Sequence, residues 1–421
     1  MNKNPVYFII FFTVLVGVLG VSISVHEVQA QYPIIRIKAD GSIDPPSANI
    51  TTSDYITYYF NGSINASIVV ERSNVTIDGA GFTLQGEHGA NGFNLTNVSN
   101  VTIKNVEIKA FEGGYGIWLD TSSNNTVLGN NITAGNGISI YFWYSSNNTI
   151  SGNNITNNHY GIFIGESTFN IISGNTVANN RAEGIRLYAS SNDNTIIGNK
   201  ITNNDHGIYL DESSDNKFYH NNFVNNTQQV FFYTSGYANS WDNEMEGNYW
   251  SNYTGVDRDP IDGIGDTSHV IDPSNRDNFP LMGMFHSFNT SVGKHVNVMS
   301  NSTVDSFEYF ESNSTIRMYL SSMTDNQTFG FCRLAIPKSL IPPPISVIIN
   351  DGSTELLCYD DAVAVNTTHR WMYFAYEHST NKIVIIPEFP SLLILPFFMA
   401  LTLLAAVAYR RKDRANLKVL A

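Results

Sequence analysis

The chain has 421 residues, which is long enough for two or three domains. It carries 37 acidic and 23 basic residues, and the resulting formal charge of −14 excludes nucleic acid or an anionic membrane surface as its main partner. Only 14% of the residues are charged, and Asn, Ser and Thr fill the polar positions instead.

Residues 1–30 have the features of a secretory signal peptide. Lys3 precedes an apolar run over residues 8–21, and Val28-Gln29-Ala30 has the small-residue character of a cleavage site. An uncleaved membrane anchor is the alternative. About eighteen Asn-X-Ser/Thr sequons, Asn61 and Asn131 among them, are potential glycan acceptors on a secreted chain. We therefore predict that the protein lies outside the cytoplasm.

Residues 31–70 are predicted to form an N-terminal cap and entry coil, and residues 71–235 then repeat with a period of roughly 22–26 residues, as in solenoids. "SNNTISGNNITNNHYGIFIG" (146–165) and "TIIGNKITNNDHGIYL" (195–210) are the clearest copies. Each copy offers three apolar strand positions. The first column is Ile77, Ile103, Val127, Ile150, Ile172, Ile196 and Phe218, and the second is Phe82, Ile108, Ile132, Ile155, Val177, Ile201 and Phe223. The third is a doublet: Phe93/Leu95, Ile117/Leu119, Ile138/Ile140, Ile162/Ile164, Ile185/Leu187, Ile208/Leu210 and Val230/Phe232.

Three short strands per repeat predict an all-β fold, a parallel β-helix of about seven coils. The doublets alternate with period two, so their apolar residues point inward and the residue between them points out. Asn suits the corners. The column Asn153, Asn175, Asn199 and Asn221 is predicted to face inward and to bond along the axis, with Ala80 and Val106 at the equivalent place in the early coils.

The outward residues of the third strand form a stripe rich in aromatic side chains. Between the doublet residues lie Asn94, Trp118, Ser139, Phe163, Arg186, Tyr209 and Phe231, and two residues further on lie Thr96, Asp120, Tyr141, Gly165, Tyr188, Asp211 and Tyr233. Aromatic rings suit the C–H faces of sugars, and charged groups can bond hydroxyls. The predicted glycan-binding residues are Trp118, Asp120, Tyr141, Phe163, Arg186, Tyr188, Tyr209 and Asp211. The alternatives are that these rings only stabilise neighbouring strands, or that the following domain packs on them.

The stripe offers no carboxylate pair of the glycosidase type. Such pairs stand about 5–9.5 Å apart, whereas Asp120 and Asp211 are four coils apart, which is about 19 Å at ~4.8 Å per coil. We therefore predict no catalytic residues and no enzymatic activity. The enzymatic alternative is a polysaccharide lyase or hydrolase that uses a cluster on this face. That cluster would contain Arg186, Asp205, Asp211 and Glu212.

Residues 236–282 are predicted to cap the last coil, because the end of a β-helix is an exposed sheet edge. Within this segment, "VDRDPIDGIGD" places four hard oxygen ligands within ten positions and predicts a calcium site. These ligands are Asp257, Asp259, Asp262 and Asp266. A polar, glycine-loosened loop without metal is the alternative.

Residues 283–386 lose the repeat and are predicted to form a small β-sandwich-like stalk domain. Cys332 and Cys358 are the only cysteines, and an oxidising compartment favours a disulfide between them over two free thiols. Residues 387–421 begin with "PEFP" and continue with the apolar stretch 391–409, which has the length of a membrane span. A basic tail from Arg410 follows, so the positive-inside rule places the tail in the cytoplasm.

The coils resemble NosD-type right-handed β-helix proteins, as do the entry "ADGSIDPPSANI" and the exit "GNYWSNYTGVDRDPIDGIGD". The closest likeness is to archaeal surface versions that end in "PEFP", a span and a basic tail. The resemblance implies a right-handed β-helix, periplasmic copper handling and a relation to carbohydrate-binding β-helices. The coils hold no Cys or Met, and their histidines do not favour copper, because His159 and His206 lie two coils and about 10 Å apart.

These observations together predict a protein anchored at the cell surface by one membrane span. Its function is predicted to be non-enzymatic glycan binding or adhesion, with extracellular polysaccharide or surface glycans as partners. A structural component of the cell envelope is a further alternative.

Overall fold

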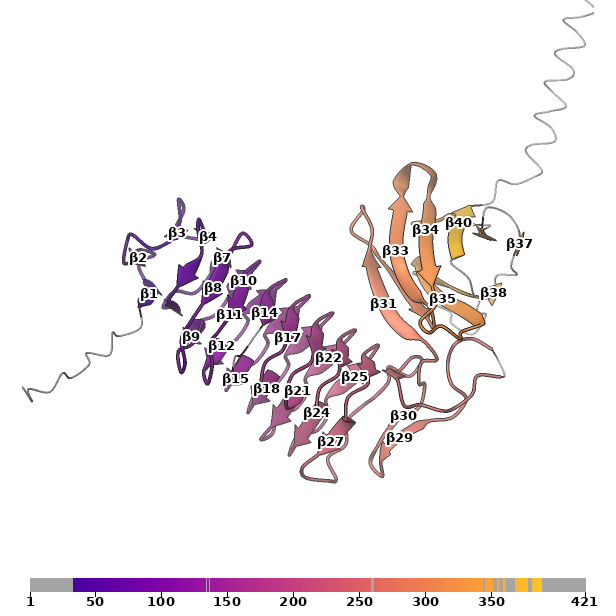
Figure 1. Ribbon diagram of the computed structural model, residues 1–421, viewed down its shortest axis with the longest axis horizontal. Helices are drawn as coiled ribbons and strands as arrows, with labels where there is room; N and C mark the ends of the chain where they lie inside the picture. The colour runs from indigo at the N-terminus through magenta and orange to yellow at the C-terminus, as the bar shows by residue number, and fades with distance from the viewer. Residues whose placement is uncertain are drawn as a thin grey trace, which may run out of the picture.

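A computed structural model describes residues 33–133, 135, 137–258, 261–343, 345–350, 354–355, 359–360, 368–377 and 381–387. The described chain is almost entirely β-structure, with one short 3₁₀ turn, η1 (Glu311–Asn313). Figure 1 shows a long β-helix followed by a second β domain at its C-terminal end. The predicted all-β class and β-helix are confirmed.

The β-helix consists of three sheets that run along its length, with parallel pairing from coil to coil and antiparallel pairs only at the N-terminal end. Sheet A contains, in spatial order, β2 (Ile43–Asp44), β1 (Ile34–Ile37), β6 (Ser67–Val70), β9 (Phe93–Thr96), β12 (Tyr115–Asp120), β15 (Ile138–Trp143), β18 (Tyr160–Gly165), β21 (Glu183–Tyr188), β24 (His206–Asp211) and β27 (Gln228–Phe232). Sheet B contains β25 (Lys217–Tyr219), β22 (Thr195–Ile197), β19 (Ile171–Ser173), β16 (Thr149–Ser151), β13 (Thr126–Leu128), β10 (Val101–Lys104), β7 (Val75–Asp78), β4 (Thr57–Phe60) and β3 (Ile50–Thr51). Sheet C contains β28 (Tyr249–Trp250), β26 (Asn222–Val224), β23 (Lys200–Thr202), β20 (Thr176–Ala178), β17 (Asn154–Thr156), β14 (Asn131–Thr133), β11 (Glu107–Lys109), β8 (Thr83–Gln85) and β5 (Ile64–Asn65).

The predicted inward columns are confirmed except at two places. In the second column Leu84, not Phe82, pairs with Ile108, and Phe82 is 37% exposed. Ala80 and Gly81, both with positive φ, form a turn that delays the strand by two residues. Ala80 is accordingly exposed and does not stand where the asparagine column begins.

The second correction lies in β15, where the inward doublet is Ile140/Phe142 rather than Ile138/Ile140. These two residues pair with Ile117 and Leu119 of β12. Ser139 is fully buried at the place that a glycine occupies in the neighbouring coils. Tyr141 therefore stands between the doublet residues, and Trp143, which the prediction left out, joins the outward face.

The predicted asparagine column is confirmed, and it runs from Asn130 to Asn248. Asn175 shows the pattern, because its Nδ2 donates to Asn199 Oδ1 (3.0 Å) and to the carbonyl of Ile150 (2.9 Å). Ladders of the same kind occupy the other corners. They comprise Asn125, Asn148, Asn170, Asn194, Asn216 and Asn239; Asn158, Asn180, Asn204 and Asn226; and Ser122, Ser145, Ser167, Ser191 and Ser213. They satisfy peptide groups that the turns would otherwise leave buried and unpaired.

Two tryptophans close the C-terminal end of the core. Trp241 stacks on Phe218 and Trp250 stacks on Phe223, each with ring centroids 4.3 Å apart. The hairpin of β29 (His269–Asp272) and β30 (Asn275–Asp277) lies beyond them. Its last residue, Asp277, accepts hydrogen bonds from Trp250 Nε1 (2.8 Å) and from the Asn248 amide (2.7 Å).

Asp277 is expected to make the stability of this cap depend on pH. Burial raises the pKa of Asp277 to about 7. A carboxyl whose pKa is raised by folding stabilises the fold below its unfolded pKa of about 3.9, and that contribution is lost as the pH rises through about 7. Asp277→Asn, which imitates the protonated carboxyl, should flatten this loss. The measurement is the difference in melting temperature between variant and wild type from pH 4 to 8, and a constant difference would contradict the expectation.

The second domain has two antiparallel five-stranded sheets around its own core. One sheet contains β31 (Met284–Asn289), β32 (His295–Ser300), β35 (Phe329–Pro337), β39 (His369–Glu377) and β38 (Tyr359–Asp360). The other contains β33 (Thr303–Phe310), β34 (Thr315–Ser321), β40 (Asn381–Pro387), β36 (Ile345–Ile349) and β37 (Thr354–Glu355). Cys332 is buried and forms no disulfide within the described residues, and burial raises the pKa of its thiol to about 11. Cys358 lies outside the described residues, so the disulfide stays a prediction.

The described ranges contain no helix that is long and apolar enough to span a membrane. The predicted signal peptide (1–30) and the predicted span (391–409) both lie outside these ranges.

Candidate functional site

The outward side of sheet A, from β12 to β27, carries three columns of side chains in register. The first column is Tyr115, Ile138, Tyr160, Glu183, His206 and Gln228; the second is Trp118, Tyr141, Phe163, Arg186, Tyr209 and Phe231; the third is Asp120, Trp143, Gly165, Tyr188 and Asp211. We call these side chains together the aromatic face. The structure therefore places all eight predicted glycan-binding residues on one side of the β-helix.

The rings of the aromatic face pack into a nearly continuous layer. Tyr141 lies 4.8 Å from Tyr115 and 5.1 Å from Phe163, between ring centroids. Trp143 is parallel to Tyr141 within 3° and stacks on Tyr188 at 6.3 Å. A Cβ atom at Gly165 would approach the Trp143 ring to 2.4 Å, so the glycine gives the indole room to lie flat.

Arg186 lies at the centre of this layer. Its guanidinium carbon is 4.4 Å from the ring centroid of Tyr209 and 5.1 Å from that of Phe163, within cation–π distance. Its Nη1 is 3.9 Å from Glu183 Oε1, whereas its Nε has no hydrogen-bond partner. The acid beside Arg186 is therefore Glu183, not one of the acids in the predicted enzymatic cluster.

Glu183 and His206 are polar residues that the sequence did not place on the aromatic face. Glu183 is 7% exposed, its Oε2 has no partner, and burial raises its pKa despite the nearby Arg186. His206 is its register partner on β24 and packs edge-on against Tyr209. Each of them comes directly before the glycine that precedes the inward doublet of its coil. Comparing this position between coils would have identified both residues.

Within the described residues, four buried polar atoms of the aromatic face form no hydrogen bond: Trp118 Nε1, Glu183 Oε2, Arg186 Nε and His206 Nδ1. Buried polar atoms in folded proteins commonly bond ordered water, so these four do not by themselves indicate a ligand.

The other predicted acids have local roles. Asp211 is 7% exposed and accepts a hydrogen bond from Thr234 Oγ1 (2.9 Å). Asp120 accepts one from Thr121 Oγ1 (3.1 Å). Asp205 Oδ2 lies 3.7 Å from His206 Nδ1, and Glu212 is exposed in a turn.

The predicted calcium ligands serve the turns of the cap. Asp257 accepts hydrogen bonds from the amides of Asp262 and Gly263, and Asp266 accepts one from the amide of Arg258. Asp262 Oδ2 lies 3.5 Å from Arg333 Nη1. Within the described ranges no three His, Cys, Asp or Glu residues are grouped to hold a metal ion. Asp259 lies outside those ranges, so the calcium site stays a prediction.

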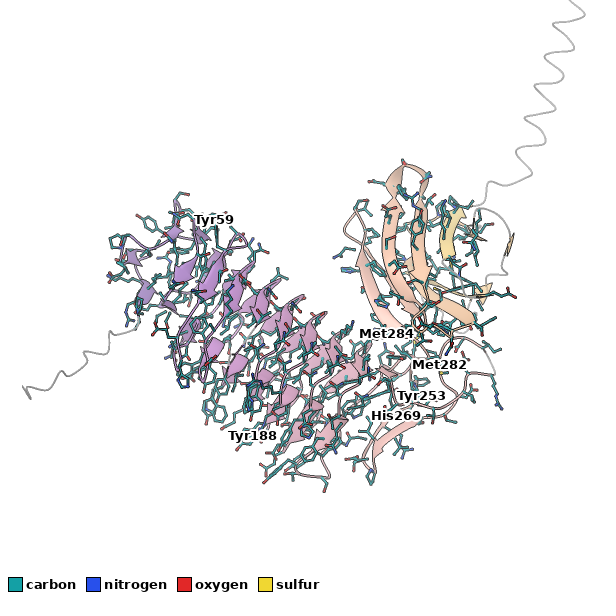
Figure 2. All side chains as sticks on the ribbon, viewed as in Figure 1. Tyr59, Tyr188, Tyr253, His269, Met282 and Met284 are labelled. Carbon is teal, nitrogen blue, oxygen red and sulfur yellow. The ribbon has the colours of Figure 1, made fainter. Side chains whose placement is uncertain are left out.

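The second domain does not cover the aromatic face. It contacts the corner between sheets B and C, where Gly152, Gly174 and His220 line a groove with Phe285 and Ser287 of β31. Figure 2 shows Tyr188 on the side of the β-helix opposite to Tyr59 of sheet B. The alternative in which this domain packs on the aromatic residues is therefore wrong.

The fold defines the class of protein, a parallel β-helix with a free aromatic face. The family model described as "Periplasmic copper-binding protein (NosD)" matches residues 49–255, just under half of the chain. This match and the fold together fit a NosD-type right-handed β-helix.

Similar solved structures include the periplasmic alginate epimerase AlgG (15% identity, 50% of this chain and 70% of that chain, TM-score 0.31). A point mutant of AlgG matches at 22% identity and TM-score 0.25 over 39% of this chain, which spans 36% of the mutant's length. The mannuronan C-5 epimerase AlgE6 A-module of Azotobacter vinelandii matches at 14% identity and TM-score 0.28, over 46% of this chain and 75% of that chain. Likeness at this level carries no argument about function. No curated protein matches the sequence.

Proposed function

We propose that this protein is a non-enzymatic carbohydrate-binding module and that a glycan chain binds along its aromatic face. The observation that carries the proposal is the ring layer itself, in which Trp118, Tyr141, Phe163 and Tyr188 are partly exposed around Arg186 while Tyr209 is buried at 8% exposure. Flat rings pack on the C–H faces of sugars, while Arg186, whose side chain is 20% exposed, supplies donors for hydroxyl groups. The distance from β12 to β27 is about 24 Å at ~4.8 Å per strand, enough for several sugar units.

The distribution of sequons supports this choice of face. The strands of sheet A from β12 to β27 contain no asparagine, although the chain is rich in it. Sequons of the same coils, such as Asn131 and Asn154, lie on sheet C instead. Glycans at Asn131 and Asn154 would therefore lie away from the aromatic face, whereas the sequon of Asn94 on β9 lies at its N-terminal edge, beside Trp118.

The proposal includes the location predicted from the sequence. The signal peptide, "PEFP" segment, membrane span and basic tail would display the β-helix outside the cell, with the second domain as the spacer. The archaeal likeness belongs to the same prediction. The family's copper handling is not part of the proposal.

The aromatic face is expected to lose its ligand when its rings are truncated. Trp118→Ala combined with Tyr188→Ala removes two contacts of about 0.5–1.5 kcal/mol each, so affinity should fall roughly fivefold to a hundredfold. A glycan array with the ectodomain (31–386) would identify a ligand, and calorimetry would measure the change. Tyr59→Ala, on sheet B and 50% exposed, is the matched control. Unchanged binding by a folded double variant would rule out this face, and ligand-free self-association that the double variant abolishes would instead favour an envelope lattice.

A polysaccharide lyase or hydrolase is the second candidate, and Glu183 is the observation that favours it. A buried carboxyl with a raised pKa is what a general acid requires, and Arg186 and His206 lie beside it. Incubating array hits with the wild type should then release reducing ends or unsaturated uronates, and Glu183→Gln should abolish the release. No release from any bound glycan would leave binding as the function.

A further inference from the structure

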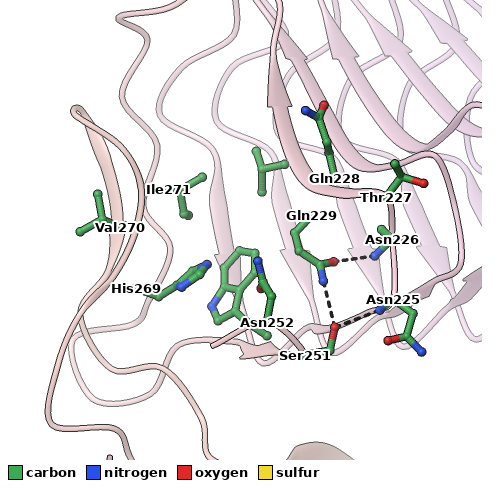
Figure 3. Close-up of a pocket in the computed structure, with 12 residues that line it drawn as sticks. Asn225, Asn226, Thr227, Gln228, Gln229, Ser251, Asn252, His269, Val270 and Ile271 are labelled. Carbon is green, nitrogen blue, oxygen red and sulfur yellow. Dashed lines mark hydrogen bonds between the residues drawn. The ribbon is translucent and has the colours of Figure 1, made fainter. Parts of the chain in front are cut away.

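A polar pocket opens at the C-terminal end of the β-helix, between the last coil and the β29–β30 hairpin (Figure 3). Its volume is about 520 Å³, which lies within the ~300–1,000 Å³ of small-molecule sites. Three separate segments form its walls, residues 225–230, 250–252 and 269–271. The pocket has room for a short carbohydrate end rather than a long chain.

One wall of the pocket is a fixed hydrogen-bond network. Gln229 Nε2 donates to Ser251 Oγ (3.0 Å), and Gln229 Oε1 accepts from Asn226 Nδ2 (2.8 Å). The amide of Asn225 donates to the same Ser251 Oγ (3.0 Å). Figure 3 shows this network along one side of the pocket. A ligand there would meet oriented groups and would not have to order them.

Other polar groups of the pocket are free to bind. The side-chain amides of Gln228 and Asn252 form no hydrogen bond within the described part of the chain, and each offers donors and an acceptor. Thr227, His269 and Ile271 line the pocket with them. Groups that both donate and accept match the chemistry of sugar hydroxyls.

The pocket carries no formal charge. None of the described residues that line it is Asp, Glu, Lys or Arg. His269 packs against Trp250 with the rings tilted by 33° and their centroids 4.7 Å apart, and burial lowers the pKa of His269, which favours the neutral imidazole. An uncharged ligand rich in hydroxyls fits this lining better than an anion or a cation does.

The pocket adjoins the aromatic face. Gln228 follows His206 in the first column, and Phe231 follows Tyr209 in the second, both on β27. We propose that the pocket is a subsite for the uncharged end of the carbohydrate chain that lies on the aromatic face. This inference rests on the proposed function. It adds that the carbohydrate chain has an uncharged terminus and that this terminus lies in the pocket.

The test uses cellohexaose, maltohexaose and mannohexaose as probes, each also in the borohydride-reduced form. The full ectodomain is produced in a host without N-glycosylation, because Asn225 and Asn252 both begin sequons. Gln229→Leu removes two of the three hydrogen bonds of the network at similar size, and Asn252→Ala removes a side-chain amide that forms no hydrogen bond within the described residues. Each should weaken binding of a hexasaccharide about tenfold and reduce discrimination between its native and reduced forms.

The outcomes separate the two proposals. If Trp118→Ala with Tyr188→Ala weakens binding while both pocket variants bind like the wild type, the subsite is overturned and the aromatic face stands. If the pocket variants alone weaken binding, the aromatic face is overturned as the site, and the pocket binds carbohydrate as a site of its own. Wild-type protein that binds none of these neutral probes would overturn the subsite. An unchanged melting temperature for Asn252→Ala keeps the test valid if Gln229→Leu fails to fold.

Discussion

Replacing Ile150 by aspartate is expected to lower the free energy of unfolding of the β-helix by about 3–5 kcal/mol. Ile150 is fully buried and stacks between Val127 and Ile172 in sheet B. The carboxylate would find no cation in this apolar column, and the removed atoms would leave a cavity in two neighbouring coils. Because each coil is stabilised only by its neighbours, a fault in the middle weakens the whole stack.

Ser151→Asp is the matched control for this experiment. Ser151 is the next residue on β16, its side chain points out, and it contacts only Ser173 by a side-chain hydrogen bond. The same charge one position along should therefore cost less than about 1 kcal/mol. Urea unfolding followed by circular dichroism gives both values. Equal stability of the two variants would mean that the inward column has been misassigned.

Periodicity predicted the core because one column of residues recurs in every coil. Periodicity gave the wrong core residues where two strand registers fit the same sequence equally well. "GISIYFW" holds three alternating apolar residues, so Ile138/Ile140 and Ile140/Phe142 satisfy the period equally. Only the fit of Ser139 against the glycines of the adjoining coils selects the second register. The asparagine ladder that contains Asn153 and Asn175 could be predicted, because its hydrogen bonds require only that an asparagine recurs at the same place in successive coils.

The aromatic face was predictable as a surface, but its chemistry was not. Alternation alone places Trp118, Phe163 and Tyr188 outward. The burial of Glu183 arises from neighbouring coils, which the period does not describe. The pocket could not be predicted from the sequence either, because its walls come from segments up to about forty residues apart.

The junction of the two domains depends on one departure from the repeat. His220 has a φ of 60° at a corner where Gly152, Gly174 and Gly198 also have positive φ. Its ring stacks on Phe285 at 4.0 Å, and its Nε2 lies 2.9 Å from Glu246 Oε2. In the last coil His220 thus takes the place of a glycine, and its side chain contacts the second domain.

Glu246 completes this junction as a buried charge. It is 3% exposed, and its Oε1 accepts a hydrogen bond from Arg333 Nε (3.0 Å) of β35. Burial alone would raise the pKa of Glu246, but His220 and Arg333 together hold it below its ordinary value. The carboxylate is therefore ionised in the folded protein. Its contribution is present above the unfolded pKa of about 4.3 and is lost as the pH falls through the lower, folded value.

Glu246→Leu is expected to cost about 3–5 kcal/mol, because it leaves the buried Arg333 without its nearest carboxylate. Differential scanning calorimetry should then show the β-helix and the second domain melting as separate transitions. Adding Arg333→Met should recover much of the loss, since an apolar pair can replace a buried ion pair. Glu308→Gln, which breaks the surface ion pair with Arg317, should cost less than about 1 kcal/mol. If Glu246→Leu costs no more than Glu308→Gln, the buried pair does not hold the domains together, and other contacts such as the His220–Phe285 stack and the Asn222–Phe285 hydrogen bonds do so.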